Sequence, residues 1–249
     1  FAGRMRAFAS LKIADLKPQT PGVVEPRTGL SMGESCEQMI KEWGISREAQ
    51  DELALMSQMN AAKAWKDGFY KDLVIPFKGL EFDNNVRADT SMEKMAKLKP
   101  AYKRAENGTI TAANASALTD GAACVLLASE DWAKKQGLPI LAYLTFQETS
   151  AVDFVKAEGL LMAPAYAVPR MLNRAGLRLQ DFDIYEIHEA FAGQVLCTLK
   201  AWESDEFCKK RLGLPGALGK IDRTKMNLKG GSVALGHPFA ATGARIMAT

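Results

Sequence analysis

The chain has 249 residues, 32 basic and 29 acidic side chains, a formal net charge of +3 at pH 7, and a composition that is 47% apolar and 24% charged. These values resemble those of ordinary globular proteins, which excludes collagen and wholesale disorder and suits one large domain or two modest ones. The balanced charge, with no block of like charges, argues against a nucleic-acid partner. No apolar run approaches the ~18–20 residues of a membrane span, so we do not expect an integral membrane protein.

The first part of the chain is predicted to be helical after a linker. Residues 1–16 fit the end of a helical segment, and a proline-rich, extended stretch follows them. One helix face is then formed by Cys36, Met39, Ile40 and Trp43, and Gly44 is expected to end that helix. Ser46 is expected to cap a second helix that runs to about Asp67. Both helices are expected to serve packing.

Strands are predicted to alternate with helices in the rest of the chain. The strand candidates are 74–77, 121–129, 141–146, 183–187 and 232–235. A helix that ends at Gly176 is indicated by Val168, Met171, Leu172 and Ala175, and a second helix face by Phe191, Val195, Leu199 and Trp202. Residues 203–226 form a charged insertion, and a helix of small residues is expected from Ala240. The alternation predicts a layered α/β fold.

The four cysteines are widely spaced and form no CxxC pair. This spacing argues against a zinc ribbon and against a thioredoxin-like redox motif, and it favours reduced thiols. Cys36 is expected on a helix core face, and Cys124 in a buried strand. The two histidines add no recognisable metal-ligand set, so no metal is expected.

The two histidines, His188 and His237, each follow a predicted strand. Either one alone is more readily explained by a packing role. Sites in α/β folds gather at the carboxyl ends of strands, so two histidines in equivalent places indicate a shared site. Glycines on both sides and Pro238 hold His237 at the tip of a tight segment, where a neutral imidazole suits the removal of a proton from a thiol.

Several segments resemble the thiolase family. Residues 230–245 resemble the signature GGxxALGHPxGxxGxR and depart from it at Ala240, where many thiolases carry Gly. Residues 107–123 are similar to the family's NGTxTAxNxSxxxDGAAA stretch, and 91–102 to its segment ending KLRPAF. Residues 185–192, YEIHEAFA, match the xEAFA motif with His in place of the commoner Asn. That variant resembles long-chain 3-ketoacyl-CoA thiolases that partner a hydratase/dehydrogenase subunit.

The resemblance implies a thiolase-like layered αβαβα fold, here incomplete. Residues 1–120 would hold the CoA-covering loop domain and a linker. Residues 121–136 would supply the last strand and a helix of the N-terminal domain, and 137–249 a truncated C-terminal domain. With most of the N-terminal core absent, apolar surface is expected to be exposed.

The resemblance also implies a reaction, the cleavage of 3-ketoacyl-CoA by CoA to acetyl-CoA and a shortened acyl-CoA, as in fatty acid β-oxidation. CoA is then a substrate, and no cofactor is expected. His237 matches the histidine that activates the cysteine nucleophile, and His188 matches the position that holds a water in the oxyanion site. Phe191 lies beside His188 and is expected to line the pocket.

Three positions match CoA-binding residues of the family. Met32 and Ser116 would lie near the pantetheine, and Arg87 near the nucleotide end, where a guanidinium suits phosphate or adenine. Bland interpretations remain open, in which Met32 is part of the core, Arg87 is a solvated surface charge and Ser116 caps a helix.

None of the four cysteines matches either catalytic cysteine of the family, so we expect a piece of a thiolase that is inactive by itself. The alternatives are a non-catalytic thiolase-like acyl-CoA or lipid binder, a biosynthetic acetoacetyl-CoA thiolase, and a structural subunit recruited through 203–226. A homodimer or homotetramer is expected. Bacterial cytoplasm is favoured over the mitochondrial matrix as the compartment.

Overall fold

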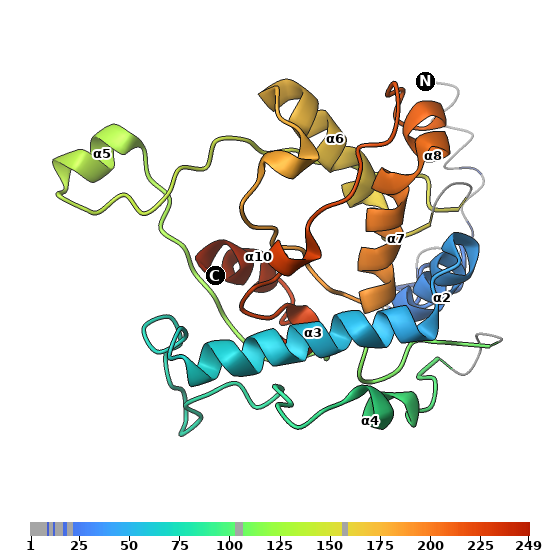
Figure 1. The fold of residues 1–249 in the computed structure, drawn as a ribbon, viewed down its shortest axis with the longest axis horizontal. Helices are drawn as coiled ribbons and strands as arrows, with labels where there is room; N and C mark the ends of the chain where they lie inside the picture. The colour runs from blue at the N-terminus through green and yellow to red at the C-terminus, as the bar shows by residue number, and fades with distance from the viewer. Residues whose placement is uncertain (1–8, 10–11, 13–16, 19–21, 103–106, 156–158) are drawn as a thin grey trace.

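The computed structural model describes residues 9, 12, 17–18, 22–102, 107–155 and 159–249. The helical segment predicted for residues 1–16 lies almost entirely outside the described residues. The path of the remaining chain is shown in Figure 1.

The two predicted N-terminal helices are confirmed. Helix α2 (Met32–Trp43) begins at a capping box in which Ser31 and Glu34 bond each other's main chain, and it ends at Gly44 in the left-handed conformation. Helix α3 (Arg47–Lys66) begins at Ser46, whose hydroxyl accepts a hydrogen bond from the Ala49 amide at 3.1 Å. These caps satisfy amides that the first turn of a helix leaves unpaired.

Helix α7 (Ala192–Glu203) is the centre of the described structure and is buried on nearly all sides. Helices α2, α3, α6 (Ala163–Ala175) and α8 (Asp205–Lys210) all pack against it, as Figure 1 shows. One apolar cluster, which includes Cys36, Ile40 and Cys197, joins α2 to α7. A second, which includes Leu53 and Val195, joins α3 to α7. The predicted end of α6 at Gly176 is confirmed.

Short helices complete the described structure. Helix α4 (Met92–Ala96) and helix α9 (Ser232–Leu235) both pack on α3 through a small cluster of Ala54, Met95 and Val233. The others are α5 (Glu130–Lys135), α10 (Thr242–Ala248) and two 3-10 turns, Leu179–Asp181 and Arg223–Lys225. Because α9 packs on α3, the residues that follow α9 begin next to this N-terminal helix.

The predicted strands are wrong as elements of the described chain. Residues 232–235 form helix α9, because Gly231 and Gly236 bound a single helical turn. Among the described residues the other four candidates form no ladder, and the pairing consists of isolated bridges such as Tyr185 to Met226. Extended backbone becomes a strand only where a neighbour supplies a run of hydrogen bonds, and among the described residues the pairing of these four stops at isolated bridges.

Cys124 is exposed, which corrects the prediction that it lies in a buried strand. The segment around it carries apolar side chains in the open, with Leu126 76% and Leu141 93% exposed. Between them, α5 projects away from the other helices in Figure 1 and buries none of its residues. The expected exposure of apolar surface is thus found along 125–146.

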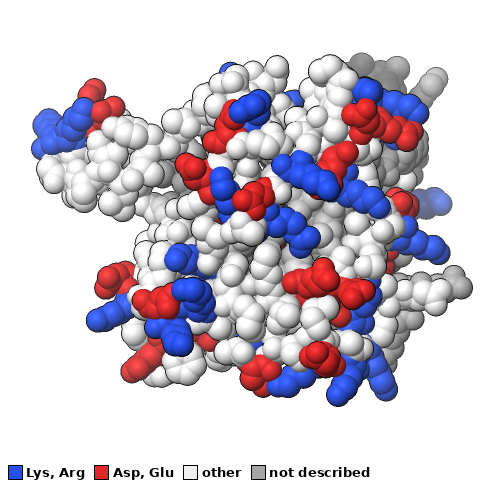
Figure 2. Space-filling model, in the orientation of Figure 1, with Lys and Arg blue, Asp and Glu red and all other residues white. Residues whose placement is uncertain are grey.

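No described helix combines the length and the apolar character needed to cross a membrane. Basic and acidic side chains are interspersed over the face drawn in Figure 2.

Candidate active site

His188 and His237 lie side by side, with their ring centroids 4.2 Å apart. His188 stands in the segment that leads into α7, and His237 follows α9. The two residues are 49 positions apart in the sequence, and the packing of α7 and α9 against α3 brings them together. The structure therefore brings these two predicted site residues together.

Hydrogen bonds from Asn227 fix the segment that carries His188. The side-chain oxygen of Asn227 accepts a bond from the Ile187 amide at 2.8 Å, and its amide nitrogen donates to the Ile187 carbonyl at 2.9 Å. The Asn227 main chain also donates to the Tyr185 carbonyl at 2.8 Å. The Asn227 side chain thus extends the single bridge between Tyr185 and Met226 to Ile187, the residue before His188.

Glu189 is fully buried beneath the two histidines. Its carboxyl group accepts hydrogen bonds from the Ser57 hydroxyl at 2.7 Å, the Asn227 side chain at 2.5 Å and the Val233 amide at 3.1 Å. Burial raises the pKa of Glu189, while these donors act in the opposite direction. The carboxyl group ties α3, the His188 segment and α9 into one unit, so it positions both histidines without facing the cleft.

The loop 109–117 is bonded to both segments that carry the histidines. The Ser116 amide and hydroxyl both donate to the Ala190 carbonyl at 3.0 Å. The His237 amide donates to the Ala117 carbonyl at 2.9 Å. Ser116 therefore bonds the His188 segment directly, and its neighbour Ala117 bonds the His237 segment. The Ser116 hydroxyl fastens a loop rather than capping a helix.

Both imidazoles are held uncharged. Burial, aided by His237 and Arg245, lowers the pKa of His188 from its ordinary 6.5 to about 4. Burial and Arg245 also lower the pKa of His237. Beside them, burial raises the pKa of Glu186 from 4.5 to about 7, against the opposing effect of the Arg245 guanidinium. Neutral imidazoles at pH 7 can accept or donate a proton, as acid–base chemistry requires.

A cleft of about 370 Å³ opens next to the histidine segments. Its lining includes the charged residues Arg87, Lys94 and Asp89 and the apolar residues Ala115, Ala117 and Val233. Ala117 bonds the main chain of His237, and Val233 follows the residue that holds His188. Neither His188 nor His237 lines this cleft, but Ala117 and Val233 connect it to the segments that carry them.

The remaining predicted site residues are more scattered. Phe191 is 7% exposed and makes an edge-to-face contact with Tyr102 at 6.2 Å, so it belongs to the packed floor of the site. Met32 is 48% exposed at the start of α2 and lines neither cleft described in this structure. Exposure of this extent disfavours the interpretation of Met32 as core.

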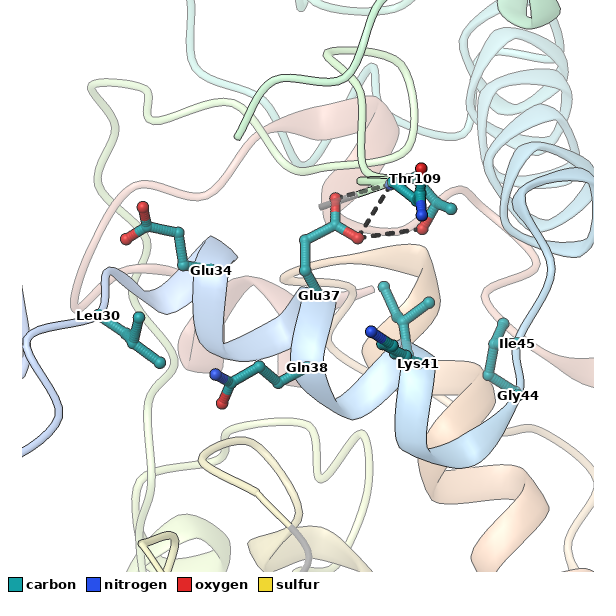
Figure 3. A pocket seen from close by; sticks show the side chains of 10 residues that line it. Leu30, Glu34, Glu37, Gln38, Lys41, Gly44, Ile45 and Thr109 are labelled. Atoms are coloured by element: carbon teal, nitrogen blue, oxygen red, sulfur yellow. Dashed lines mark hydrogen bonds between the residues drawn. The ribbon is translucent and has the colours of Figure 1, made fainter. Parts of the chain in front are cut away.

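A second cleft, of about 390 Å³, lies along α2 and contains none of the predicted site residues (Figure 3). One of its charged side chains, Glu37, turns toward Thr109 and accepts bonds from the Thr109 amide and hydroxyl and from the Ile110 amide, at 2.7–3.1 Å. Glu37 thus fastens the loop 109–117 to α2. Among the described residues, no group of three or more His, Cys, Asp and Glu side chains is arranged to hold a metal ion.

Several residues that build the site were not singled out as site residues from the sequence. These are Ser57, Glu186, Glu189, Asn227, Ser232, Thr242 and Arg245. Most of them lie within the quoted family segments, and their nearness to the histidines in sequence was the available signal. Ser57 had none, because it is an ordinary polar residue in the middle of a helix.

Two family models match the chain, the thiolase N-terminal domain at residues 7–131 and the thiolase C-terminal domain at residues 138–249. The chain belongs to the thiolase family. The 3-ketoacyl-CoA thiolases of Yersinia enterocolitica and Serratia proteamaculans are 48% and 49% identical to it over 98% of its length. This thiolase chain spans 57% of the length of each of these two relatives.

Solved thiolase structures share the fold. Bacillus anthracis acetyl-CoA acetyltransferase has a TM-score of 0.76 at 35% identity, over 96% of this chain and 60% of that one. Human mitochondrial 3-ketoacyl-CoA thiolase has a TM-score of 0.73 at 31% identity, over 91% and 53%. The expected resemblance and the thiolase-like fold class are therefore confirmed. The absence of ladders in the described residues accords with an incomplete copy of that fold.

Proposed function

We propose that the whole protein is a 3-ketoacyl-CoA thiolase, an acyltransferase that cleaves 3-ketoacyl-CoA with CoA in fatty acid β-oxidation. The observation that carries the proposal is the pair of neutral imidazoles, with ring centroids 4.2 Å apart, near a cleft whose lining includes Arg87 and Lys94. The proposal follows the relatives at 48–49% identity, which bear this name, rather than the acetyl-CoA acetyltransferase at 35%. A biosynthetic acetoacetyl-CoA thiolase is the second candidate, and the chain-length profile distinguishes the two.

In this proposal His237 takes the proton of the attacking thiol, and His188 helps to stabilise the oxyanion, directly or through a water. Proton transfer of this kind contributes about 10²–10⁴-fold to a rate. Donors fixed at an oxyanion contribute about 3–4 kcal/mol each. Both roles require uncharged imidazoles, which the lowered pKa values of the two histidines supply.

CoA is proposed to occupy the cleft with its phosphates toward Arg87 and its thiol end toward the histidines. The Arg87 main chain is fixed by the Gln58 side chain at 2.7 Å, and its guanidinium donates to the Asn84 carbonyl at 2.6 Å, which leaves further donors for phosphate. Ser116 and Met32 are proposed to border the pantetheine. CoA serves as a substrate in this scheme.

The reacting thiols are proposed to be none of the four cysteines of this chain. Cys36, Cys197 and Cys208 are fully buried, and burial raises the pKa of Cys36 and takes that of Cys197 to about 12. A buried thiol with a raised pKa is a poor nucleophile. We therefore propose that the 249-residue chain alone does not turn over ketoacyl-CoA.

The wider proposals rest on the family. The domain division is taken as 1–120 for the loop region, 121–136 for the last piece of the N-terminal domain and 137–249 for the C-terminal domain. A homodimer or homotetramer, a hydratase/dehydrogenase partner and a cytoplasmic location complete the proposal.

The first experiment measures thiolysis of a medium-chain 3-ketoacyl-CoA by the full-length protein, its His237→Ala variant and the 249-residue chain. We expect turnover in the full-length protein, a fall in kcat of about 10²–10⁴-fold in the variant, and none in the chain alone. Turnover that survives His237→Ala would contradict the role of His237. Turnover by the chain alone would mean that one of its own cysteines reacts.

A second experiment measures CoA binding to the 249-residue chain by calorimetry. Arg87→Ala is expected to weaken binding about tenfold, equivalent to about 1.4 kcal/mol. Arg178→Ala is the matched control, because Arg178 pairs with Asp181 away from the cleft. Equal losses in the two variants, or none in either, would show that the cleft does not receive the charged end of CoA.

A further inference from the structure

Ser232 bridges His188 and Arg245. The Ser232 oxygen lies 2.8 Å from Nδ1 of His188 and accepts a hydrogen bond from the Arg245 guanidinium at 3.1 Å. The Ser232 side chain is fully buried at the start of α9. The position of its single hydroxyl proton therefore decides which nitrogen of His188 carries a proton.

The donors and acceptors around Ser232 determine where its hydroxyl proton lies. A guanidinium only donates, so the Ser232 oxygen accepts from Arg245 and its own proton needs another acceptor. Within the described part of the chain, Nδ1 of His188 is the one acceptor that the Ser232 hydroxyl contacts. A buried hydroxyl without an acceptor is costly, so Ser232 donates to Nδ1. The proton of the neutral His188 ring is then on Nε2.

Thr242 holds His237 in the opposite sense. The Thr242 oxygen lies 2.7 Å from Nδ1 of His237, and the Thr242 hydroxyl donates to the Pro238 carbonyl one turn earlier at 3.3 Å. With its proton used there, Thr242 can only accept from the ring. Both bonds form when Nδ1 of His237 carries the proton, whereas the other tautomer leaves the Pro238 contact without a proton.

We propose that Ser232 and Thr242 are positioning residues that hold the two imidazoles in opposite tautomers, with His188 protonated on Nε2 and His237 protonated on Nδ1. His188 then presents an N–H donor through Nε2, and His237 presents a bare Nε2 that accepts a proton. The meaning of this arrangement for catalysis rests on the proposed function, because donor and base are the two roles assigned there. The tautomers themselves follow from hydrogen bonding alone.

Opposite tautomers allow the two imidazoles, whose ring centroids are 4.2 Å apart, to act as a donor and as a base. Burial lowers the pKa of both rings, so each is neutral at pH 7 and has one proton to place. Arg245 affects the His188 tautomer indirectly, because its hydrogen bond to the Ser232 oxygen directs the Ser232 proton toward His188. Within the described residues, the Thr242 hydroxyl contacts His237 and the Pro238 carbonyl and receives no such bond from a cation.

Nitrogen NMR of the 249-residue chain labelled with ¹⁵N-histidine tests the proposal directly. The chain contains two histidines, so each ring gives its own pair of nitrogen signals, and His188→Gln assigns them. At about pH 8, where a histidine of ordinary pKa is neutral, we expect one ring protonated on Nε2 and the other on Nδ1.

The variants separate the two positioning residues. Ser232→Ala is expected to abolish the single-tautomer signature of His188 and to leave that of His237 intact. Thr242→Val, which keeps the shape of the side chain, is expected to do the reverse, and Thr242→Ser is expected to restore the parent signature. Amide spectra of each variant confirm that it is folded.

Two results would overturn the proposal: the same tautomer on both rings of the parent chain, or parent signatures that persist in folded Ser232→Ala and Thr242→Val. The measurement requires no turnover. Opposite tautomers in a full-length protein that lacks thiolysis would therefore reject the proposed function and leave the positioning roles standing.

Discussion

The main chain of Gly231 lies directly against the carboxyl group of Glu189, so a Cβ atom on residue 231 would overlap that group. The Gly231 amide also donates to the Ser57 hydroxyl at 2.9 Å, and Ser57 in turn donates to Glu189. Glycine is required here for close approach and not for an unusual φ, which is −104°. The start of α9, and with it the approach to His237, depends on that missing side chain.

Gly231→Ala is expected to destabilise the chain by about 1–3 kcal/mol, because the added methyl group must displace a buried, hydrogen-bonded carboxyl group. Urea unfolding followed by circular dichroism measures the change. Gly243→Ala is the matched control, since a Cβ atom there meets nothing within 4 Å and the residue lies in α10. A loss in the control as large as in Gly231→Ala would contradict the packing argument.

The pH dependence of stability is expected to carry opposite contributions from His188 and Glu186. The folded pKa of His188 is about 4 against an ordinary 6.5, so the unfolded chain binds more protons there between these values. Its contribution to stability falls as the pH drops from 6.5 to 4. The folded pKa of Glu186 is about 7 against 4.5, so its contribution rises as the pH drops from 7 to 4.5.

Two variants separate these contributions in urea unfolding measured between about pH 4 and pH 7. His188→Gln is expected to reduce the loss of stability on acidification, and Glu186→Gln is expected to increase it. The other titrating groups are common to all three proteins. Identical pH profiles would show that neither side chain has a shifted pKa in the folded chain.

Arg245→Met is expected to raise the pKa of both histidines, because the Arg245 guanidinium lowers each of them. Nη1 of Arg245 is buried without a hydrogen bond and lies 3.9 Å from the Glu186 carboxylate, so water screens this charge poorly. Proton NMR titration of the two rings reads both pKa values. Arg178→Met, on the exposed surface, should leave them unchanged.

Ser46→Ala is expected to cost about 1 kcal/mol, because the Ala49 amide loses its cap at the start of α3. Ser46→Asp keeps an acceptor at the cap and should retain the stability of the parent chain. Urea unfolding distinguishes the two, and an equal loss in both would mean that the cap does not stabilise α3. The test bears on the site because α3 carries Ser57, which holds Glu189.

Local chemistry in the sequence was enough to predict the longer helices α2, α3, α6 and α7 and to single out the two histidines. Ser46 and Gly44 mark helix ends because their effects act within one turn, and the spacing of Cys36 to Trp43 shows one packed face. The segments around His188 and His237 carried the family resemblance in their own residues.

Only the tertiary structure decided what surrounds those histidines. A run such as 121–129 becomes a strand or remains extended according to whether a partner lies beside it, which its own residues cannot specify. In the same way, Ser57 meets Glu189 across 132 positions, and the lowered pKa of His188 arises from burial and from Arg245. Helix caps and packed helix faces depend on neighbouring residues. Burial and long-range hydrogen bonds, and the pKa shifts that they cause, depend on which distant segments pack together.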